Sequence, residues 1–270
     1  LPDRFAGAGV RDAEPFEIAD AIDGRTAMIH WVAGPAARPS LDEVVAVADR
    51  AGLPVLVDAA AELPPATNLR RFIESGADLV VFSGGKALGG PQASGILAGR
   101  RDLIMAAALQ QLDLDIALAQ WRPPADFIDL SQLAGLPQHG IGRPCKVGKE
   151  EVVGLLVALE RFLADDPAAR RAAWRDRLLE IRHGLLGRRG LEVVLRDEGE
   201  VPLLALEIDE QRLGRTAFDL LLALEAGEPS IRPYSSEIHD RRLLINPLAL
   251  RGGEPGAIVD AVIRLLETSS

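Results

Sequence analysis

Between residues 26 and 83 the sequence alternates apolar runs with amphipathic segments of helical period. Buried strands are predicted in TAMIHWVAG (26–34), LPVLVDAAAE (53–62) and DLVVFS (78–83). Helices are predicted in SLDEVVAVADRAG (40–52), which has a serine cap, and in NLRRFIESGA (68–77), with Asn68 as its cap. Strands joined by helices of this length predict an α/β fold with a mostly parallel sheet and right-handed crossovers.

Beyond residue 100 the pattern changes. A helix is predicted over 100–111, whereas residues 112–148, rich in proline and glycine and without a clear period, predict a long ordered loop. Two further helices are predicted over 149–166 and about 168–187. The rest predicts a small α+β domain with an antiparallel sheet covered by helices. We therefore expect residues 1–148 to be part of a large domain, 149–189 to be connecting helices and 190–270 to form the small domain.

The charge balance and the single cysteine narrow the class of protein. Asp and Glu outnumber Lys and Arg by 40 to 30, for a net charge of −10, which argues against the broad basic surface of a nucleic-acid binder. Cys145 is the only cysteine, so no internal disulfide or cysteine-rich metal site is expected. No apolar run reaches the ~20 residues that span a bilayer, and no signal peptide precedes the domain, so the cytoplasm is expected. The chain begins with Leu1 rather than methionine, which predicts a fragment.

Asp58 and Lys86 follow two consecutive predicted strands. In a parallel sheet the carboxyl ends of the strands lie at one edge, where ligands bind. A P-loop is excluded, because it needs glycine in place of Val80 and Ser or Thr in place of Ala87. The sequence also lacks a G-x-G-x-x-G fingerprint, a G-x-S-x-G elbow and a histidine pair spaced for zinc. What remains is an acid and a lysine at adjacent strand ends, with small residues around both.

This pair matches the needs of pyridoxal phosphate (PLP). The cofactor requires a lysine amine for its aldehyde, a carboxylate for its pyridine nitrogen and donors for its phosphate. Lys86, Asp58 and Ser83 would fill these three roles. Glycines without a Cβ would let the backbone approach the cofactor, at Gly84, Gly85, Gly89 and Gly90. The alternative is that Asp58 only caps the next helix and Lys86 is an exposed turn residue, but their joint placement favours a site.

The block VDAAAELPPATNLRRFIESGADLVVFSGGKALGGPQASGILAGRRDLI (57–104) resembles the core of the selenocysteine synthase-like group of fold-type I PLP-dependent enzymes. That group includes L-seryl-tRNA(Sec) selenium transferase and small-substrate lyases such as D-glucosaminate-6-phosphate ammonia-lyase. HGIGRPCKVGKEEVVGLLVALERF (139–162) continues the similarity, which covers essentially the whole chain. The resemblance implies the fold-type I architecture, with residues 1–148 as part of the PLP-binding large domain.

The resemblance also implies roles for single residues. Lys86 would carry the aldimine, and Asp58 would pair with the pyridinium nitrogen. The turn after the lysine would reach the phosphate site of a neighbouring subunit in a homodimer or larger homo-oligomer, through Gly90, Pro91 and Gln92.

In the long loop, an anionic substrate would be bound by His139, Arg143 and Lys146. The helix start that follows this segment is favourable for anions. The alternatives are a hydrogen bond to loop backbone for the histidine and simple solvation for the two cations.

Members of the group carry a further stretch of roughly a hundred residues, the size of a small domain, before the point that corresponds to the start of this chain. That stretch supplies a glycine-rich phosphate cradle and a group that stacks on the cofactor ring. We expect that part of the natural protein is missing from this sequence. The alternatives are a segment supplied from elsewhere and a loss of cofactor binding.

The resemblance implies aldimine and carbanion chemistry on an amino acid or amino sugar acid, ending in an elimination as in a lyase. The acidic charge favours this small-molecule reaction over that of L-seryl-tRNA(Sec) selenium transferase, whose tRNA needs a cationic surface. The third alternative is a non-catalytic remnant that serves as an assembly subunit.

Overall fold

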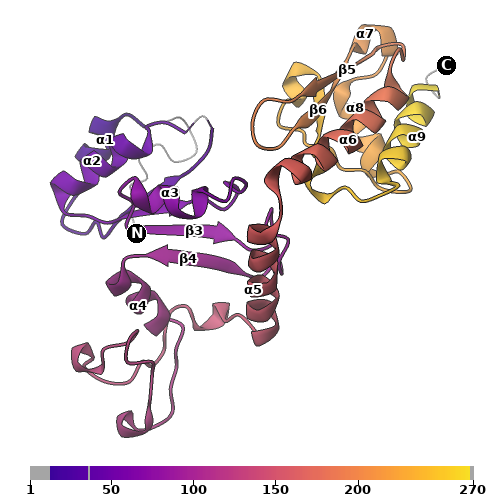
Figure 1. Ribbon diagram of the computed structural model, residues 1–270. Helices are drawn as coiled ribbons and strands as arrows, with labels where there is room; N and C mark the ends of the chain where they lie inside the picture. The colour runs from indigo at the N-terminus through magenta and orange to yellow at the C-terminus, as the bar shows by residue number, and fades with distance from the viewer. Residues whose placement is uncertain (1–12, 36, 268–270) are drawn as a thin grey trace. The chain divides into compact units, whose positions relative to one another are not determined.

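The computed structural model describes residues 13–35 and 37–267 of the chain (Figure 1). The chain forms two compact units, residues 1–164 and residues 165–270. Within the described residues no helix is both long and apolar enough to cross a membrane. The three domain parts with limits at residues 148 and 189 remain a prediction.

The first unit contains the predicted parallel-dominated sheet. Its strands are β1 (Ile29–Val32), β2 (Val55–Asp58), β3 (Leu79–Ser83) and β4 (Gly95–Gly99), in the order β1-β2-β3-β4. β1, β2 and β3 run parallel, and β4 returns antiparallel beside β3. The α/β fold class is confirmed, and the carboxyl ends of β2 and β3 lie at one edge of the sheet.

The helices described in this unit are α1 (Pro15–Ala21), α2 (Leu41–Ala51), α3 (Asn68–Glu74), α4 (Arg101–Leu109) and α5 (Lys149–Ala164). The serine cap of α2 is confirmed, because the Ser40 hydroxyl accepts the Glu43 N–H and the Glu43 carboxylate accepts the Ser40 N–H at 2.8 Å. The predicted cap of α3 is wrong. Thr67 precedes that helix, while Asn68 is buried in its first turn and donates from Nδ2 to the Glu62 carbonyl at 2.6 Å.

The core of the first unit forms where the strands meet their helices. Val55 and Val57 of β2, and Val80 and Phe82 of β3, are at most 1% exposed. Full burial of one such side chain contributes about 1.5 to 3 kcal/mol to folding. The cluster is completed from α2, α3 and α5 by Val44, Phe72 and Phe162. Figure 1 shows α5 next to the carboxyl end of β3.

The predicted long loop between α4 and α5 is confirmed. It contains only the short 3-10 helices η1 (Leu118–Gln120), η2 (Leu130–Gln132) and η3 (Arg143–Cys145). The loop returns to the end of α4, where the Gly140 N–H donates to the Leu112 carbonyl and the Gly142 N–H to the Gln110 carbonyl, at 3.2 and 2.8 Å.

The second unit is the predicted α+β part. Its antiparallel sheet has the order β5-β6-β7, formed by β5 (Leu191–Arg196), β6 (Leu203–Ile208) and β7 (Arg242–Ile245). The accompanying α-helices are α6 (Pro167–Leu185), α7 (Glu210–Leu213), α8 (Ala217–Glu225) and α9 (Glu254–Glu267). Two 3-10 turns, η4 (Ile238–Asp240) and η5 (Pro247–Ala249), flank β7. Leu178, Ile181 and Leu185 of α6 are fully buried against leucines of this sheet.

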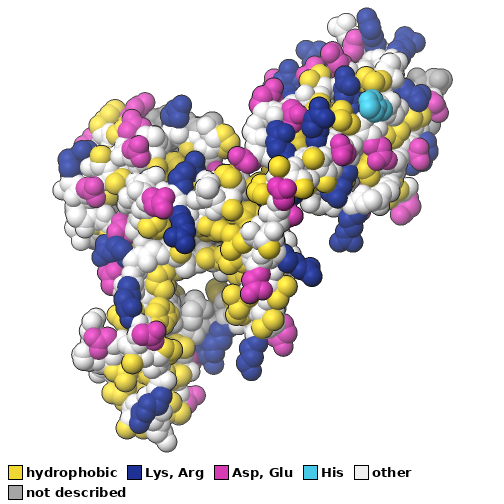
Figure 2. All heavy atoms as spheres, viewed as in Figure 1, with side chains coloured by type: hydrophobic (Ala, Val, Ile, Leu, Met, Phe, Trp, Pro, Cys, Tyr) yellow, Lys and Arg dark blue, Asp and Glu magenta, His cyan; other side chains and the backbone are white. Residues whose placement is uncertain are grey.

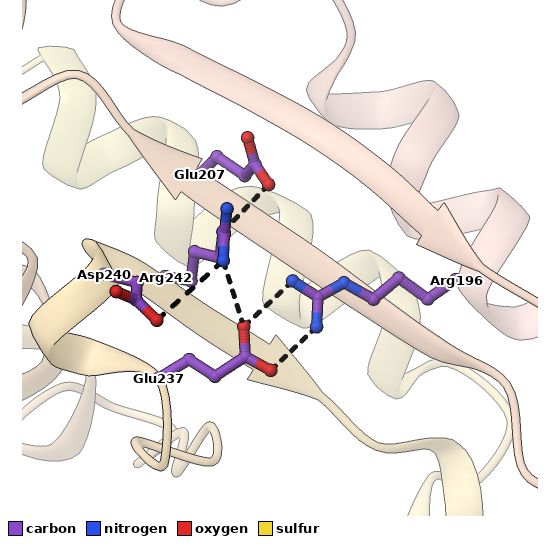
Figure 3. A network of polar contacts seen from close by, with 5 residues as sticks. All are labelled: Arg196, Glu207, Glu237, Asp240 and Arg242. Atoms are coloured by element: carbon purple, nitrogen blue, oxygen red, sulfur yellow. Dashed lines mark hydrogen bonds and ion pairs between the residues drawn. The ribbon is translucent and has the colours of Figure 1, made fainter.

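A network of charged side chains crosses this sheet (Figure 3). Arg196 of β5 forms a two-point ion pair with Glu237, with N–O distances of 2.7 and 2.9 Å. Arg242 of β7 contacts Glu207 of β6 at 3.0 Å and Glu237 at 3.5 Å. Hydrogen bonds from Arg196, and the nearby charge of Arg242, hold the pKa of Glu237 below its ordinary value. The network therefore ties all three strands together through charge.

The variant Glu237→Gln is expected to lower the free energy of unfolding by about 1 to 2 kcal/mol at about pH 7, because two arginines lose their shared carboxylate. The folded-state pKa of Glu237 lies below the unfolded value. Its contribution is therefore fully present above the unfolded value and is lost as pH falls through the folded one. Urea unfolding at about pH 7 and about pH 3 should show the gap between wild type and variant closing in acid. The control is Glu180→Gln, an exposed carboxylate outside the network, and a gap that is the same at both pH values would contradict the account.

Candidate functional site

Asp58 ends β2 and lies between two neighbouring strands. The Ala33 N–H donates to its carbonyl at 2.9 Å, and the next residue, Ala59, donates to the Val81 carbonyl of β3 at 2.9 Å. The side chain is half-buried, and its Oδ1 accepts the Ala60 N–H at 3.0 Å. This bond closes a local turn and caps no helix, because the next helix, α3, begins at Asn68 with Thr67 before it. The second carboxylate oxygen has no hydrogen-bond partner within the described residues.

Lys86 lies on a tight turn that begins directly after β3. The Gly84 N–H donates to the Ser94 carbonyl at 2.9 Å, and the Gly90 N–H donates to the Gly84 carbonyl at 2.8 Å, so the turn is closed at its base. Leu88 is buried in the core, whereas Lys86 is exposed. The turn is thus anchored by one apolar side chain while it presents the amine outward.

Two glycines allow this turn to fold back on itself. A Cβ at Gly85 would lie 2.7 Å from the Gln92 Cα, and one at Gly84 would collide with the Ser94 side chain. Any other residue at these positions would force the turn apart. The glycines of the S-G-G-K segment are therefore explained by close approach of the backbone.

The residues around the turn add a hydroxyl and a firm support. Ser83 is half-buried at the end of β3, where it is paired with Gly95 of β4. The turn rests against α5, since a Cβ at Gly154 would lie 2.7 Å from the Pro91 ring. Gln92 is exposed. The contact between Pro91 and α5 fixes the backbone of the turn, although the Lys86 side chain on it is exposed.

The three predicted substrate-binding residues of the long loop gather around a carboxylate that sequence reasoning missed, Asp113. The His139 N–H donates to its Oδ1 at 3.1 Å, and the Arg143 Nε lies 2.9 Å from its Oδ2. His139 itself has a left-handed backbone, with φ of 54°. The hydrogen bond from His139, and then the charges of Arg143, His139 and Lys146, lower the pKa of Asp113. Asp113 therefore stays ionised and orders this part of the loop.

His139, Arg143 and Lys146 are all exposed. Within the described residues, no hydrogen bond or ion pair joins them to Asp58 or Lys86. The LDLD segment at the start of the loop, which contains Asp113, was the one signal in the sequence that could have pointed to their partner.

The chemistry of the strand ends fits PLP. A half-buried carboxylate with one open oxygen follows β2, an exposed amine follows β3, and a half-buried hydroxyl precedes that amine. The close-packed glycines leave backbone, rather than side chains, along the turn. Among the described residues, no group of three or more His, Cys, Asp or Glu side chains is placed to hold a metal ion. The amine, the carboxylate and the hydroxyl are the groups that the aldehyde, the ring nitrogen and the phosphate of PLP require.

Comparisons with known proteins agree with this chemistry. Residues 24–120 match the family model described as SelA, L-seryl-tRNA selenium transferase, and this segment includes both Asp58 and Lys86. The chain is 34% identical over 250 residues to a 5'-C-glycyluridine monooxygenase-decarboxylase of a Streptomyces species, covering 91% of this chain and 52% of the relative. It is 28% identical over 263 residues to the D-glucosaminate-6-phosphate ammonia lyase of Salmonella typhimurium, covering 94% of this chain and 61% of that enzyme.

The structural comparison leads to the same group. A solved structure of D-glucosaminate-6-phosphate ammonia-lyase superposes with a TM-score of 0.68 at 26% identity, covering 96% of this chain and 62% of the other. The chain thus spans between about half and three fifths of the length of the curated relatives it matches. By sequence and by fold, this chain is a relative of the SelA-like group of fold-type I PLP-dependent enzymes.

Proposed function

We propose that the protein containing this chain is a PLP-dependent lyase that acts on an amino acid or amino sugar acid by elimination. The observation that carries the proposal is the placement of Asp58 and Lys86 at the carboxyl ends of two adjacent parallel strands, with a glycine-closed turn between β3 and the lysine. The ammonia lyase relative, aligned over 94% of this chain, supports elimination as the reaction type.

PLP, when bound, supplies a protonated ring that withdraws electrons from the substrate. In the proposal, the Asp58 carboxylate keeps the ring nitrogen protonated, since an opposite charge within hydrogen-bond distance favours the protonated form. Lys86 would hold the aldehyde through its Nζ and would move a proton at the substrate α-carbon. Ser83 donates its hydroxyl to the phosphate, and Gly85 lets the backbone approach it.

Substrate anions are assigned to the cluster around Asp113. The carboxylate engages the Arg143 Nε. Within the described residues the two terminal nitrogens of the guanidinium form no hydrogen bond, and they would donate to a carboxylate or phosphate of the substrate. His139 and Lys146 add donors from the same loop. In this proposal Asp113 acts as a positioning residue, because it orients Arg143 without contacting the substrate.

A homodimer, or a larger assembly of dimers, is proposed as the working form. α5, on which the Lys86 turn rests, exposes a row of apolar side chains that are 45 to 59% accessible, formed by Val152, Val153, Leu156 and Val157. A second copy of the chain is the occupant we assign to this row. Gly90 and Gln92, on the segment that follows the lysine, would then serve the phosphate of the neighbouring copy.

The alternative function is L-seryl-tRNA(Sec) selenium transfer, which the family model over residues 24–120 favours. The same Asp58 and Lys86 would serve that reaction. The difference lies in the substrate, since a tRNA requires many phosphate contacts whereas the net charge of this chain is −10. Small-molecule elimination therefore ranks first.

Lys86→Ala in the full-length protein is expected to abolish both borohydride-trapped cofactor and substrate elimination, because no other amine replaces the covalent anchor. Lys149→Ala, which changes a lysine at the start of α5, is the matched control and should keep full trapping. Peptide mapping after reduction identifies the modified residue. A pyridoxyl group on any other lysine would show that the site is misplaced.

Asp58→Asn should retain cofactor but reduce elimination by roughly 100-fold, since loss of a neighbouring carboxylate lowers the proton affinity of the ring nitrogen by about 1 to 3 pK units. The rate of elimination and the amount of trapped cofactor are measured on the same preparation. Equal activity of variant and wild type would exclude the proposed role of Asp58.

Binding of a seryl-tRNA should be no tighter than the nonspecific range of about 10⁻⁴ to 10⁻⁶ M at physiological salt, because the chain is acidic. A filter-binding titration at several salt concentrations measures this affinity. Tight, steeply salt-dependent binding would move selenium transfer to first place.

A further inference from the structure

Two Arg–Arg pairs that are far apart in the sequence line a single cavity of the second unit. Arg188–Arg189 lie on the turn between α6 and β5, and Arg241–Arg242 lie at the start of β7. The cavity is open to solvent, has a volume of about 670 Å³ and is bordered on a third side by α7, which adds Arg212. Figure 2 shows basic side chains gathered among acidic ones over the end of this unit at which α7 lies in Figure 1.

The backbone fixes both arginine pairs. Gly190 has φ of 71°, and a Cβ there would lie 2.5 Å from the Leu213 Cγ, so the turn that carries Arg188 and Arg189 is packed directly on α7. Arg241 has φ of 60°, a left-handed conformation that is uncommon for a residue other than glycine. Its N–H donates to the Ile238 carbonyl at 2.9 Å and closes η4. The backbone positions from which the four arginine side chains extend are therefore well defined.

Charge in the cavity is only partly neutralised. Arg242 is engaged by Glu207 and, at 3.9 Å, by Asp240, as Figure 3 shows. Arg212 pairs with Asp209 at 3.2 Å. Among the described residues, the one ion pair of Arg188 is a long contact of 3.9 Å with the exposed Glu267.

By contrast, Arg189 and Arg241 form no ion pair within the part of the chain that the structure describes. One lining carboxylate, Glu192, is also without an ion pair among these residues, and it lies directly across from Glu207 in the β5–β6 register. Five arginines and four carboxylates thus line the cavity. Two of the guanidiniums form no ion pair among the described residues, a third is weakly held, and two of the carboxylates are neighbours across the β5–β6 pair.

The arginines left unpaired among the described residues and the two adjacent carboxylates together favour a ligand that has an anionic group at one end and hydroxyl groups at the other. Guanidinium groups bind phosphate through paired N–H donors, and a phosphate monoester brings about 1.5 to 2 negative charges and three acceptor oxygens. A simple carboxylate brings only one negative charge and two acceptor oxygens. Glu192 and Glu207, which only accept hydrogen bonds when ionised, would repel a second anion but would accept hydrogen bonds from hydroxyl groups.

We propose that this cavity binds a phosphorylated polyol or sugar, with its phosphate on Arg189 and Arg241 and its hydroxyl groups on Glu192. The volume lies within the range of small-molecule sites, about 300 to 1,000 Å³. An RNA backbone is the less suitable ligand, because the acidic chain disfavours an extended polyanion. The proposed site uses none of the residues assigned to catalysis.

The test is calorimetric titration of the full-length, cofactor-loaded protein with glucose 6-phosphate, inorganic phosphate and glucose. Glucose 6-phosphate should bind once per chain, and the double variant Arg189→Gln/Arg241→Gln should weaken that binding at least about tenfold, as expected for the loss of charge-assisted hydrogen bonds. The matched control, Arg232→Gln/Arg251→Gln, removes two exposed arginines of the same unit that lie outside this cavity and should change the affinity less than twofold. Glu192→Gln should weaken the binding of glucose 6-phosphate but leave the binding of inorganic phosphate unchanged.

Three results would overturn the proposal. The first is an absence of glucose 6-phosphate binding to the wild type at millimolar concentration. The second is undiminished binding by the Arg189→Gln/Arg241→Gln variant, which unfolding curves would show to be folded. The third is salt-sensitive tRNA binding that is lost in that variant while glucose 6-phosphate binding is retained, which would make the cavity an RNA contact.

Discussion

The parallel pairing of β2 with β3 is the constraint on which the candidate site depends. It places Asp58 opposite Val81, so that the chain leaving each strand emerges at the same edge of the sheet. The pairing is held by the burial of Val57, Val80 and Phe82, none of which is more than 1% exposed. Without that core, the carboxylate and the lysine would have no fixed relation, and the chemistry proposed for them would be lost with it.

Much of this arrangement could be predicted because it is local in the sequence. Apolar runs of strand length identified β2 and β3, and the ends of those runs identified Asp58 and Lys86 without knowledge of tertiary contacts. The serine cap of α2 was predicted in the same way. Asn68 shows the limit, because its side chain is used for a buried bond to Glu62 rather than for a cap, and a cap signal does not distinguish these uses.

Contacts between distant segments could not be predicted. Asp113 is joined to Arg143 across the long loop, and the loop has no hydrophobic period from which its path could be inferred. The convergence of Arg189 and Arg241 on one cavity has the same origin, since the Gly190 turn packs against α7 while Arg241 is held at the end of β6, where its carbonyl accepts the Ile208 N–H. Side-chain clusters of this kind become visible only when the turns themselves are placed. The donors at the strand ends, Asp58, Ser83 and Lys86, could be predicted from the sequence. Asp113, which contacts Arg143 and His139 in the loop, could not.

The central claim is that Lys86 and Asp58 hold the two ends of one PLP molecule. A crystal structure of the cofactor-bound, full-length protein tests this most directly. The account predicts continuous density from the Lys86 Nζ to the cofactor and an Asp58 oxygen at about 2.7 to 3.2 Å from the ring nitrogen. Density that joins the cofactor to a different lysine, or a ring nitrogen that faces a group other than Asp58, would contradict it.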